Sequence, residues 1–364
     1  MTNLNKKTAV VLFNLGGPDA PTSVKPFLFN LFNDHAIIGL PQPFRYFLAK
    51  LISSKREKKA QAIYAQIGGK SPLLDFTLAQ AYELEKELSF SGNFKVFVAM
   101  RYWKPFAEEA VEEVRKYDPD QLILLPLYPQ FSSATSESSI DDFVEKFKIS
   151  RKKSEKNIAT KIVCCYPTEP DFIKSHGFLI KQTILKSSAD FTKFRFLFSA
   201  HGLPQKLIDR GDPYVFQVAE TTKKIVENLA EICAVKEEEI NFQICYQSKV
   251  GPLQWTSPSL DQEIKRAALD KKIPVIVPVA FVSEHSETLV ELDIDYKELA
   301  HKFGIEEYLR VPALNMDGHF IKSLVAICKK VDASDDLGFF SGPVPARICP
   351  KKMKLCINPN SCDA

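Results

Sequence analysis

Short, almost continuously apolar runs alternate along this chain with longer amphipathic stretches, and this alternation constrains the fold more than any other feature. Apolar runs of about four to eight residues are typical of strands that are buried on both faces of a sheet. Strands separated by helices predict right-handed crossovers and parallel sheets. We expect strands at 8–14, 95–101, 121–128, 161–166, 194–200, 240–246, 273–281 and 308–313. Helical patterns lie between them, for example at 72–89, 105–117, 213–232, 285–302 and 316–332.

The length of 364 residues is large for a single hydrophobic core, so two domains are expected. The strands divide into two sets near 150–160, where the polar stretch from Ser150 to Asn157 is typical of a linker or a solvated loop. We predict one α/β domain at 1–157, completed by the helix at 316–332, and a second at 158–315. Two doubly wound parallel-sheet domains of this kind leave one central cleft between them. The segment 341–364 has no clear period and is predicted to be a cysteine-rich tail.

The composition argues against several classes of protein. A net charge of +3 gives no reason to expect nucleic acid as a main partner. No apolar run approaches the roughly 20 residues that span a bilayer, and the N-terminus lacks the cleavage site of a secretory signal. We therefore expect a cytoplasmic chain. In that compartment the 8 cysteines are better explained as core residues or metal ligands than as disulfides.

Two of the predicted strands end in titratable side chains. His201 follows the apolar run that begins at Phe196, and Gly202 comes directly after it. The run from Ile273 to Phe281 leads in the same way into Glu284 and His285. Ligands of open α/β sheets bind outside the carboxyl ends of the strands. His201 is therefore a candidate for proton transfer or metal contact, since the pKa of histidine, about 6.5, suits both. The alternative is a structural histidine that bonds a backbone carbonyl.

Glu287, Glu291 and Asp295 recur at intervals of four residues after the second of these strands. On a helix, residues four apart lie on one face, where like charges repel one another. A row of carboxylates that faces a cleft could accept protons or pass a divalent cation inward. The alternative is a solvated acidic face. The position of the row at the tip of a buried strand favours the functional interpretation.

Aromatic and basic residues follow two other predicted strands. Arg101, Tyr102 and Trp103 come after the strand at 95–101, and Tyr246 begins a segment that reaches Trp255. Aromatic rings beside basic side chains suit a flat, anionic, aromatic ligand. Packing between domains is the alternative. The basic run from Ser53 to Lys59 could bind carboxylates or face anionic lipid, although such a run is more often a solvated helix face.

Three cysteines, Cys349, Cys356 and Cys362, lie close together near the C-terminus. Exposed free thiols are reactive, so their accumulation indicates metal ligation rather than an incidental feature of a flexible tail. Four thiolates complete a zinc or an iron–sulfur site. The fourth ligand must come from elsewhere in the chain, and Cys164 and Cys165 are the candidates.

An ordered series of motifs between about residue 8 and residue 330 resembles the ferrochelatases, bacterial class II chelatases that insert ferrous iron into a porphyrin. The motifs are LFNLGGP from Leu12, IGGKSP from Ile67, MRY from Met100, LYPQ from Leu127, SAHGLP from Ser199, GDPY from Gly211, QSKVGP from Gln247 and EHSETLVELD from Glu284. Each motif alone is weak, but the collinear set is specific and covers nearly the whole chain.

The resemblance implies two similar Rossmann-like halves around a porphyrin cleft. It implies that the chain inserts Fe²⁺, as a substrate, into protoporphyrin IX to form protohaem with release of two protons. In the family pattern His201 and Glu287 are the catalytic pair that handles the iron, on opposite sides of the macrocycle. Glu291, Asp295 and His285 extend the acidic path, which is a π-helical stretch in the family. The residues that would bind the porphyrin are Leu15, Arg56, Ser71, Arg101, Tyr102, Tyr128, Tyr246 and Trp255.

The resemblance also implies a 2Fe-2S cluster, which some members bind through a C-terminal cysteine group. By that comparison Cys349, Cys356 and Cys362 are ligands. Animal-type members take the fourth ligand from the segment after Tyr128, which holds no cysteine here, and bacterial members take it a little later, about where Cys165, or else Cys164, lies. The family further implies a peripheral membrane contact of an apolar lip near Phe44, and it leaves a homodimer open. Four alternatives remain: coproporphyrin as the substrate, a different metal such as cobalt, a porphyrin or haem carrier without turnover, and an iron–sulfur sensor built on a chelatase.

Overall fold

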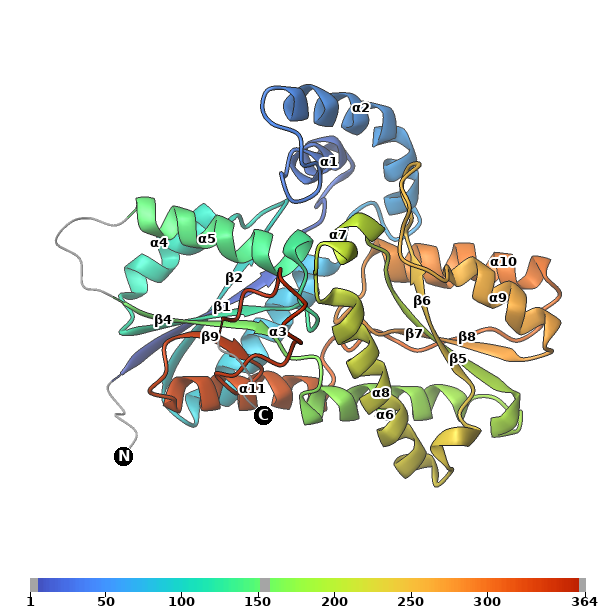
Figure 1. Ribbon diagram of the computed structural model, residues 1–364. Helices are drawn as coiled ribbons and strands as arrows, with labels where there is room; N and C mark the ends of the chain where they lie inside the picture. Colours follow the sequence, from blue (N-terminus) through green and yellow to red (C-terminus); the bar gives the residue numbers. More distant parts are fainter. Residues whose placement is uncertain (1–5, 151–157, 360–364) are drawn as a thin grey trace. The chain divides into compact units, whose positions relative to one another are not determined.

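A computed structural model describes residues 6–150 and 158–359 of the chain (Figure 1). The described residues form two compact units, and each contains one parallel sheet. The first unit comprises Met1–Tyr166, Leu324–Ile348 and Cys356–Ala364. The second comprises Pro167–Ser323 and Cys349–Leu355. The linker expected at 150–157 lies almost entirely outside the described residues.

The first unit has a five-stranded sheet in the order β2-β1-β3-β4-β9. Its strands are β1 (Lys7–Asn14), β2 (Asn93–Met100), β3 (Gln121–Pro126), β4 (Ala159–Cys165) and β9 (Gly338–Ser341). All pairs are parallel, as the alternation of strands and helices predicts. The helices of this unit are α1 (Val24–Phe32), α2 (Phe44–Ala65), α3 (Leu73–Ser89), α4 (Ala107–Tyr117) and α5 (Ser138–Ile149), with the 3-10 turn η1 (Pro21–Ser23) and the π-helix η2 (Ser133–Glu137).

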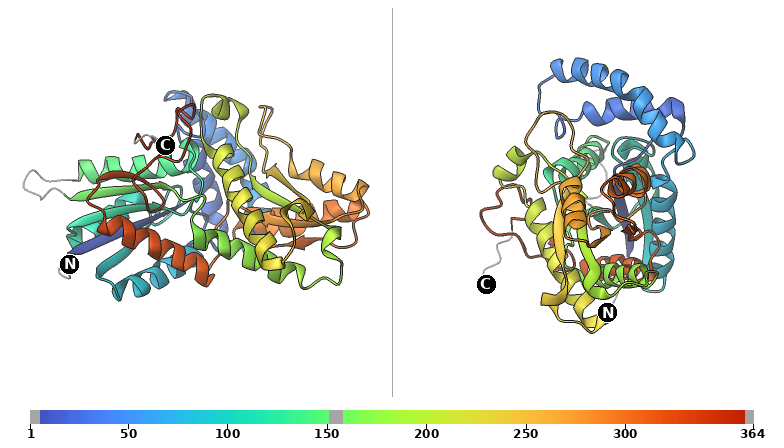
Figure 2. Two further views of the ribbon diagram at one scale, coloured as in Figure 1. Left: turned by 60° about the horizontal axis from the view of Figure 1, so that its bottom comes forward. Right: turned by 90° about the vertical axis from the view of Figure 1, so that its right-hand side faces the viewer.

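The two faces of β1 are both covered, which is why the strand is an almost unbroken apolar run. Ala9, Val11 and Phe13 pack with side chains of α4 and α5 on one face. Helix α3 and the C-terminal part of α11 (Gly318–Ala333) lie on the opposite face of this sheet (Figure 1 and Figure 2). Helix α11 begins in the second unit and ends in the first.

The second unit has a four-stranded parallel sheet in the order β6-β5-β7-β8. Its strands are β5 (Phe194–His201), β6 (Phe242–Gln247), β7 (Ile273–Pro278) and β8 (Leu309–Arg310). Its helices are α6 (Pro170–Ile184), α7 (Gln205–Asp209), α8 (Tyr214–Cys233), α9 (Leu260–Leu269) and α10 (Tyr296–Lys302), with the 3-10 turns η3 (Phe191–Lys193) and η4 (Glu237–Glu239) and the π-helix η5 (Glu287–Asp295). One core of this unit packs Leu197 and Ile276 of the sheet against Leu260 of α9, Leu292 of η5 and Ala300 of α10.

Three features differ from the sequence-based expectation. Strand β4 pairs with β3, so the first unit reaches Tyr166 and not residue 157. Strand β8 stops at Arg310 and not at 313, because Pro312 has no N–H with which to continue the ladder. The stretch predicted as a single helix at 285–302 is the π-helix η5 followed by α10.

The C-terminal segment is also more ordered than the predicted tail. Gly338–Ser341 forms β9, which pairs with β4 at the edge of the first sheet. Beyond β9, Ser341 and Val344 form an isolated bridge, and the N–H of Leu355 donates to the carbonyl of Gly211 at 3.1 Å. The segment therefore contributes to both units, with Cys349–Leu355 in the second and Cys356 in the first. Among the described helices none has the length and apolar character needed to cross a membrane.

His176 of α6 gives the second unit a testable acid sensitivity. Its ring lies 4.9 Å from the ring of Phe172, and within the described chain neither ring nitrogen has a hydrogen-bond partner. Burial lowers the pKa of His176 to about 3 from 6.5. Because the unfolded chain binds the proton more readily, the neutral ring favours folding above pH 6.5, and this contribution is lost as the pH falls towards 3.

We expect His176→Met to remove this part of the pH dependence. Between pH 6.5 and pH 5 the wild type should lose about 1.6 kcal/mol of unfolding free energy through His176, because the slope rises from half of its full value of about 1.4 kcal/mol per pH unit at pH 6.5. Urea unfolding of both proteins at several pH values measures the difference. An identical pH dependence in the two proteins would show that His176 does not titrate on unfolding.

Candidate active site

His201 is the last residue of β5, one of the two strands that have a neighbour on each side in the second sheet. Its Nδ1 lies 2.6 Å from the carbonyl oxygen of Gly202. Because a carbonyl only accepts, this contact assigns the hydrogen to Nδ1 and leaves the lone pair of a neutral ring on Nε2. His201 therefore does bond a backbone carbonyl, as the structural alternative predicts. That hydrogen bond uses Nδ1 and leaves Nε2 available.

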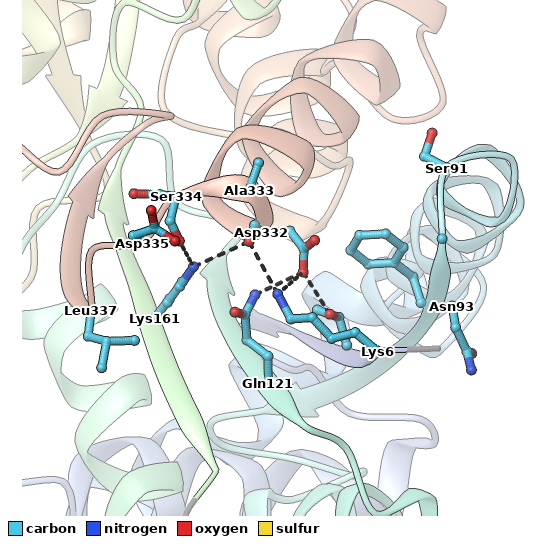
Figure 3. A pocket seen from close by; sticks show the side chains of 13 residues that line it. Lys6, Ser91, Asn93, Gln121, Lys161, Asp332, Ala333, Ser334, Asp335 and Leu337 are labelled. Atoms are coloured by element: carbon cyan, nitrogen blue, oxygen red, sulfur yellow. Dashed lines mark hydrogen bonds and ion pairs between the residues drawn. The ribbon is translucent and has the colours of Figure 1, made fainter. Parts of the chain in front are cut away.

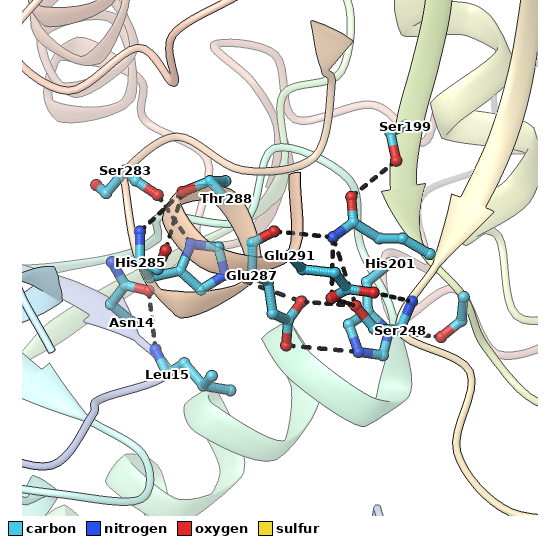
Figure 4. Close-up of polar contacts among 12 residues, drawn as sticks. Asn14, Leu15, Ser199, His201, Ser248, Ser283, His285, Glu287, Thr288 and Glu291 are labelled. Atoms are coloured by element: carbon cyan, nitrogen blue, oxygen red, sulfur yellow. Dashed lines mark hydrogen bonds and ion pairs between the residues drawn. The ribbon is translucent and has the colours of Figure 1, made fainter. Parts of the chain in front are cut away.

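Glu287, the first residue of η5, lies directly opposite this free nitrogen. His201 Nε2 is 3.7 Å from Glu287 Oε1, and His285 Nε2 is 3.9 Å from Glu287 Oε2 (Figure 4). The side chains of His201 and Glu287 are 35% and 27% exposed, so both are accessible to a ligand. The two residues are far apart in sequence, but the ends of β5 and β7 bring them together, as the rule for strand tips predicts.

Glu291 is held by the end of β6, one strand further along the sheet. Its Oε1 accepts from the backbone N–H of Ser248 at 3.0 Å, and its Oε2 accepts from the Ser248 hydroxyl at 2.6 Å. The same hydroxyl lies 3.4 Å from Glu287 Oε2 and thus bridges the two carboxylates (Figure 4). Gln247 Nε2 donates to Glu291 at 3.3 Å, and Ser199 in turn donates to Gln247 at 2.7 Å.

The two carboxyl groups have pKa values that move in opposite directions. Burial alone would raise the pKa of Glu287, but the charges of His201 and His285 and the hydrogen bond from Ser248 outweigh it and lower the pKa to about 2. Burial, and then the negative charge of Glu287, raise the pKa of Glu291. A pair of titratable groups separated in this way can divide two roles between them, an anion and a proton carrier.

The π-helix keeps part of the predicted acidic row together. Residues four apart remain on about the same side of an i to i+5 helix, so Glu287 and Glu291 both reach Ser248. Asp295 is exposed where η5 joins α10. His285 is buried, with Nδ1 3.2 Å from the carbonyl of Ser283. The structure thus places His285, Glu287 and Glu291 in one cluster and leaves Asp295 at its outer end.

Two of the residues predicted to bind an aromatic ligand lie beside this cluster in the second unit. Trp255 has its ring centroid 6.3 Å from that of His201, and within the described chain its Nε1 has no hydrogen-bond partner. Tyr246, the residue before Gln247 in β6, is buried, and burial raises the pKa of its hydroxyl to about 12. It is therefore neutral at physiological pH.

Arg101 and Tyr102, from the first unit, form a network that the sequence analysis did not include. Both donate to Asp34: Arg101 Nη2 lies 2.8 Å from Asp34 Oδ2, and the Tyr102 hydroxyl also lies 2.8 Å from it. Ser138 completes the network, with hydrogen bonds to Asp34 at 2.6 Å and from Arg101 Nε at 2.8 Å. Tyr102 is only 2% exposed and packs in an apolar cluster, so its side chain supports Arg101 and does not line an open surface.

The other predicted porphyrin-binding residues also belong to the first unit. Leu15 and Tyr128 are partly buried at the ends of β1 and β3. Ser71 is buried just before α3, and its hydroxyl accepts from the N–H of Leu73 at 3.3 Å. Arg56 is exposed on α2, with its guanidinium 5.7 Å from the ring centroid of Phe32.

The candidate cluster cysteines have different surroundings. Cys164 and Cys165 are buried with Phe131, Ile348 and Ile357. Cys349 is buried too, and Gln217 Nε2 lies 3.0 Å from its sulfur. Cys356 is partly exposed, and Cys362 lies outside the described residues. Between residues 6 and 359, wherever the structure is described, no three His, Cys, Asp or Glu side chains form a group that could hold a metal ion.

Comparison with known proteins identifies the family. The family model named Ferrochelatase matches residues 7–331. The chain belongs to the ferrochelatase family. A ferrochelatase of Rickettsia bellii (strain OSU 85-389) is 50% identical to it over 359 residues, which are 98% of this chain and 96% of the relative. A ferrochelatase of Pelagibacter ubique (strain HTCC1062) is 46% identical over 354 residues, 96% of this chain and 98% of the relative.

Among solved structures, SirB from Bacillus subtilis with Fe3+ shares the fold. Its TM-score is 0.51 at 13% sequence identity, and the match covers 90% of this chain and 96% of that one. The resemblance inferred from the motifs is thus confirmed for the family, and the two parallel-sheet α/β units agree with a ferrochelatase fold.

Sequence patterns located the strand tips but missed the side chains that hold the acidic residues. Gln247 and Ser248 were noted as part of a segment that suits an aromatic ligand and of one family motif, but not as partners of the acidic residues. Their role as partners of Glu291 could have been found from the rule of strand ends, because β6 is adjacent to β5. Asp34 gives no comparable signal, since it lies after α1 and is separated from Arg101 by two helices and a strand.

Proposed function

We propose that this chain inserts Fe²⁺ into protoporphyrin IX, with His201 and Glu287 as the catalytic pair. The observation that carries the proposal is the 3.7 Å approach of His201 Nε2 to Glu287 Oε1 at the carboxyl edge of a parallel sheet, in a chain that belongs to the ferrochelatase family. Both side chains come from positions that match the family motifs.

The reaction exchanges one divalent cation for two pyrrole protons and requires no oxidant or reductant. A flat macrocycle shields its nitrogen lone pairs, so an enzyme that binds a bent ring more tightly than a flat one lowers the barrier. We propose that His201 Nε2 accepts pyrrole protons, since Nδ1 is already engaged by Gly202. Ionised Glu287 and the more basic Glu291 would then carry protons, or iron, along the path that ends at exposed Asp295.

The porphyrin-binding residues form the second part of the proposal. We propose that the porphyrin is bound by Leu15, Arg56, Ser71, Arg101, Tyr102, Tyr128, Tyr246 and Trp255. Arg101 is the strongest candidate for an anionic group of the porphyrin, because Asp34 and Ser138 fix its guanidinium while the side chain stays 21% exposed. Tyr102 would contribute indirectly, because its hydroxyl donates to Asp34, which in turn holds Arg101.

An anaerobic assay with ferrous iron tests this function. The purified chain is mixed with Fe²⁺ and protoporphyrin IX, and the shift of the Soret band is followed at several porphyrin concentrations. A parallel series with coproporphyrin decides between the two substrates by their kcat/KM values. Tight porphyrin binding without any metal insertion would instead support a carrier and overturn the proposed activity.

The location of the protein is a further part of the proposal. We propose that it works in the cytoplasm and contacts the membrane peripherally through α2. Phe44, Phe47 and Leu51 are exposed on this helix, and basic residues follow them from Lys55 to Lys59. Apolar side chains beside cations suit an interface with anionic lipid. Sedimentation with anionic vesicles tests the membrane contact. Light scattering of the purified protein alone tests for the homodimer.

We also propose a 2Fe-2S cluster bound by Cys165, Cys349, Cys356 and Cys362. Ile348 and Ile357, the neighbours of Cys349 and Cys356 in the chain, both pack on the apolar cluster around Cys164 and Cys165. This packing supports the choice of Cys165 and Cys356, although the described side chains do not form a preassembled metal site. No step of the proposed iron insertion depends on this group.

Chemical analysis checks the cluster directly. We expect protein purified without oxygen to contain about two irons and two acid-labile sulfides per chain, the content of one such cluster. Cys356→Ser should lose both, whereas Cys245→Ser should not, because Cys245 is buried in the core of the second sheet. Colourless protein without sulfide would contradict the proposal.

A further inference from the structure

The stretch from Tyr308 to Asn315 holds the segment that carries His285, Glu287 and Glu291. We propose that Arg310, on β8, is a positioning residue for iron insertion, and that it fixes the Glu287 and Glu291 carboxylates by clamping both sides of the segment that carries them. The inference rests on the proposed function of that segment. Arg310 itself is not assigned to the reacting atoms.

Arg310 binds two carboxylates that bracket the site. Its Nε lies 2.7 Å from Asp293 Oδ1, and its Nη2 pairs with Asp293 Oδ2. Its Nη1 lies 2.5 Å from Glu284 Oε1. Glu284 immediately precedes His285, and Asp293 lies inside η5, so the three ion-pairing atoms of one guanidinium connect the entrance of the segment to its far half.

Neighbouring residues strengthen both ends of this clamp. At the entrance, Glu284 Oε1 also accepts from the N–H of Ala313 at 2.9 Å, and Asn315 Oδ1 accepts from the N–H of Glu284 at 2.9 Å. In η5, the Tyr308 hydroxyl donates to the carbonyl of Leu292 at 2.8 Å. The loop after β8 therefore binds the site segment through backbone and side chains together.

The base of the clamp is rigid. Arg310 pairs with Ile276 of β7 in the sheet, and the N–H of Val311 donates to the carbonyl of Ile276 at 2.8 Å. The side chains of Arg310 and Glu284 are only 13% and 8% exposed. Removal of the cation would leave a buried carboxylate without its partner, so the segment would have to move until Glu284 reached water.

The direction of the side chains explains why such a movement would reach the reaction. Asp293 turns towards β8, whereas Glu287 and Glu291 turn towards Ser248 and His201. Side chains of one π-helix are thus bound on two sides, by Arg310 on one and by Ser248 and His201 on the other. A shift of the helix away from β8 changes the 3.7 Å approach of Glu287 to His201 directly. Misplacement of a catalytic group by about 1 Å can cost on the order of 10²-fold in rate.

A matched pair of arginine variants separates this role from simple stability. Arg310→Met (R310M) is compared with Arg195→Met (R195M), which also removes a largely buried arginine from the second sheet. Arg195 is the second residue of β5, at the end of the strand away from His201. Its Nη2 pairs with Asp270 at 2.8 Å, and its Nε donates to Asn241 at 2.8 Å. Each variant is assayed for thermal stability, for kcat and KM with Fe²⁺ and protoporphyrin IX, and for hydrogen exchange of the peptide that covers residues 284–296.

We expect R310M to lower kcat by about 100-fold with little change in KM for the porphyrin, and to accelerate exchange in this peptide. R195M should lower the melting temperature but leave kcat and that exchange as in the wild type. Arg310→Lys keeps the positive charge but loses the planar guanidinium that binds both carboxylates, so it should recover only part of the lost kcat.

The inference is overturned if R310M leaves the exchange of residues 284–296 unchanged, or if its kcat falls no further than that of R195M. A wild type that inserts no iron would refute the proposed function instead. The exchange experiment would then still decide whether Arg310 holds the segment, because it requires no turnover.

Discussion

Replacing Glu287 by glutamine is expected to lower kcat for iron insertion by about 10²- to 10⁴-fold, the range typical of a lost general acid or base. Glutamine keeps the size and the hydrogen-bonding shape of the side chain but cannot hold a proton or a negative charge. Since the pKa of Glu287 is about 2, the wild-type carboxylate is ionised over the whole working pH range. The loss should therefore appear at every pH from 6 to 9.

Stopped-flow insertion at saturating porphyrin measures the change. Glu298→Gln provides the matched control, because Glu298 is an exposed acid of α10 whose side chain lies 3.9 Å from Lys302. The control should keep the wild-type kcat. His201→Ala, assayed in the same way, should fall by a similar factor. Turnover of the glutamine variant close to the wild-type rate would remove the Glu287 carboxylate from the chemistry.

Replacing Lys161 by methionine is expected to lower the free energy of unfolding of the first unit by about 3 kcal/mol. Lys161 is 2% exposed, and its ammonium group donates to the carbonyls of Val331 and Ser334 at 2.8 and 2.5 Å, with a longer contact to Asp332. Val331 and Asp332 carry two of the last carbonyls of α11, which no helical N–H can reach, and Ser334 directly follows the helix. Each buried carbonyl left without a donor costs about 1–3 kcal/mol.

Lys6→Met is the matched control, since Lys6 lines the same pocket of about 490 Å³ (Figure 3). The Lys6 side chain is 30% exposed and pairs with the Asp332 carboxylate at 3.1 Å, to which Thr8 and Gln121 also donate. Lys6 also donates to the Asp332 carbonyl at 3.2 Å, but Lys161 reaches that carbonyl too, at 3.4 Å. Its loss should therefore cost less than about 1 kcal/mol. Urea unfolding measures both variants, and equal losses in the two would show that Lys161 does not cap α11.

The sequence was most informative where local pattern and topology agree. Apolar runs located the strands because parallel sheets bury both faces, and the ends of β5 and β7 then brought His201 and Glu287 together. The π-helix was predicted from the family resemblance and not from the residue pattern, because a spacing of four residues between carboxylates fits α and π geometry alike.

Contacts between distant segments could not be derived in this way. Arg310 lies in a strand of only two residues, and nothing near it in the sequence indicates that it pairs with Glu284 and Asp293. Asp34 is similar, since its partners Arg101 and Ser138 come from other elements. Strand β9 was missed because a four-residue strand carries little periodic signal and its partner β4 lies far back in the chain.

The position of β9 decides how the C-terminal cysteines should be studied. This strand is one of the two edge strands of the first sheet and covers one edge of β4. A chain shortened before Gly338 would present a bare row of N–H and C=O groups, to which another polypeptide can add. Aggregation or lost solubility of such a deletion would then come from the uncovered edge and would be mistaken for a missing metal group. Single serine replacements avoid the confusion, because they keep the sheet complete.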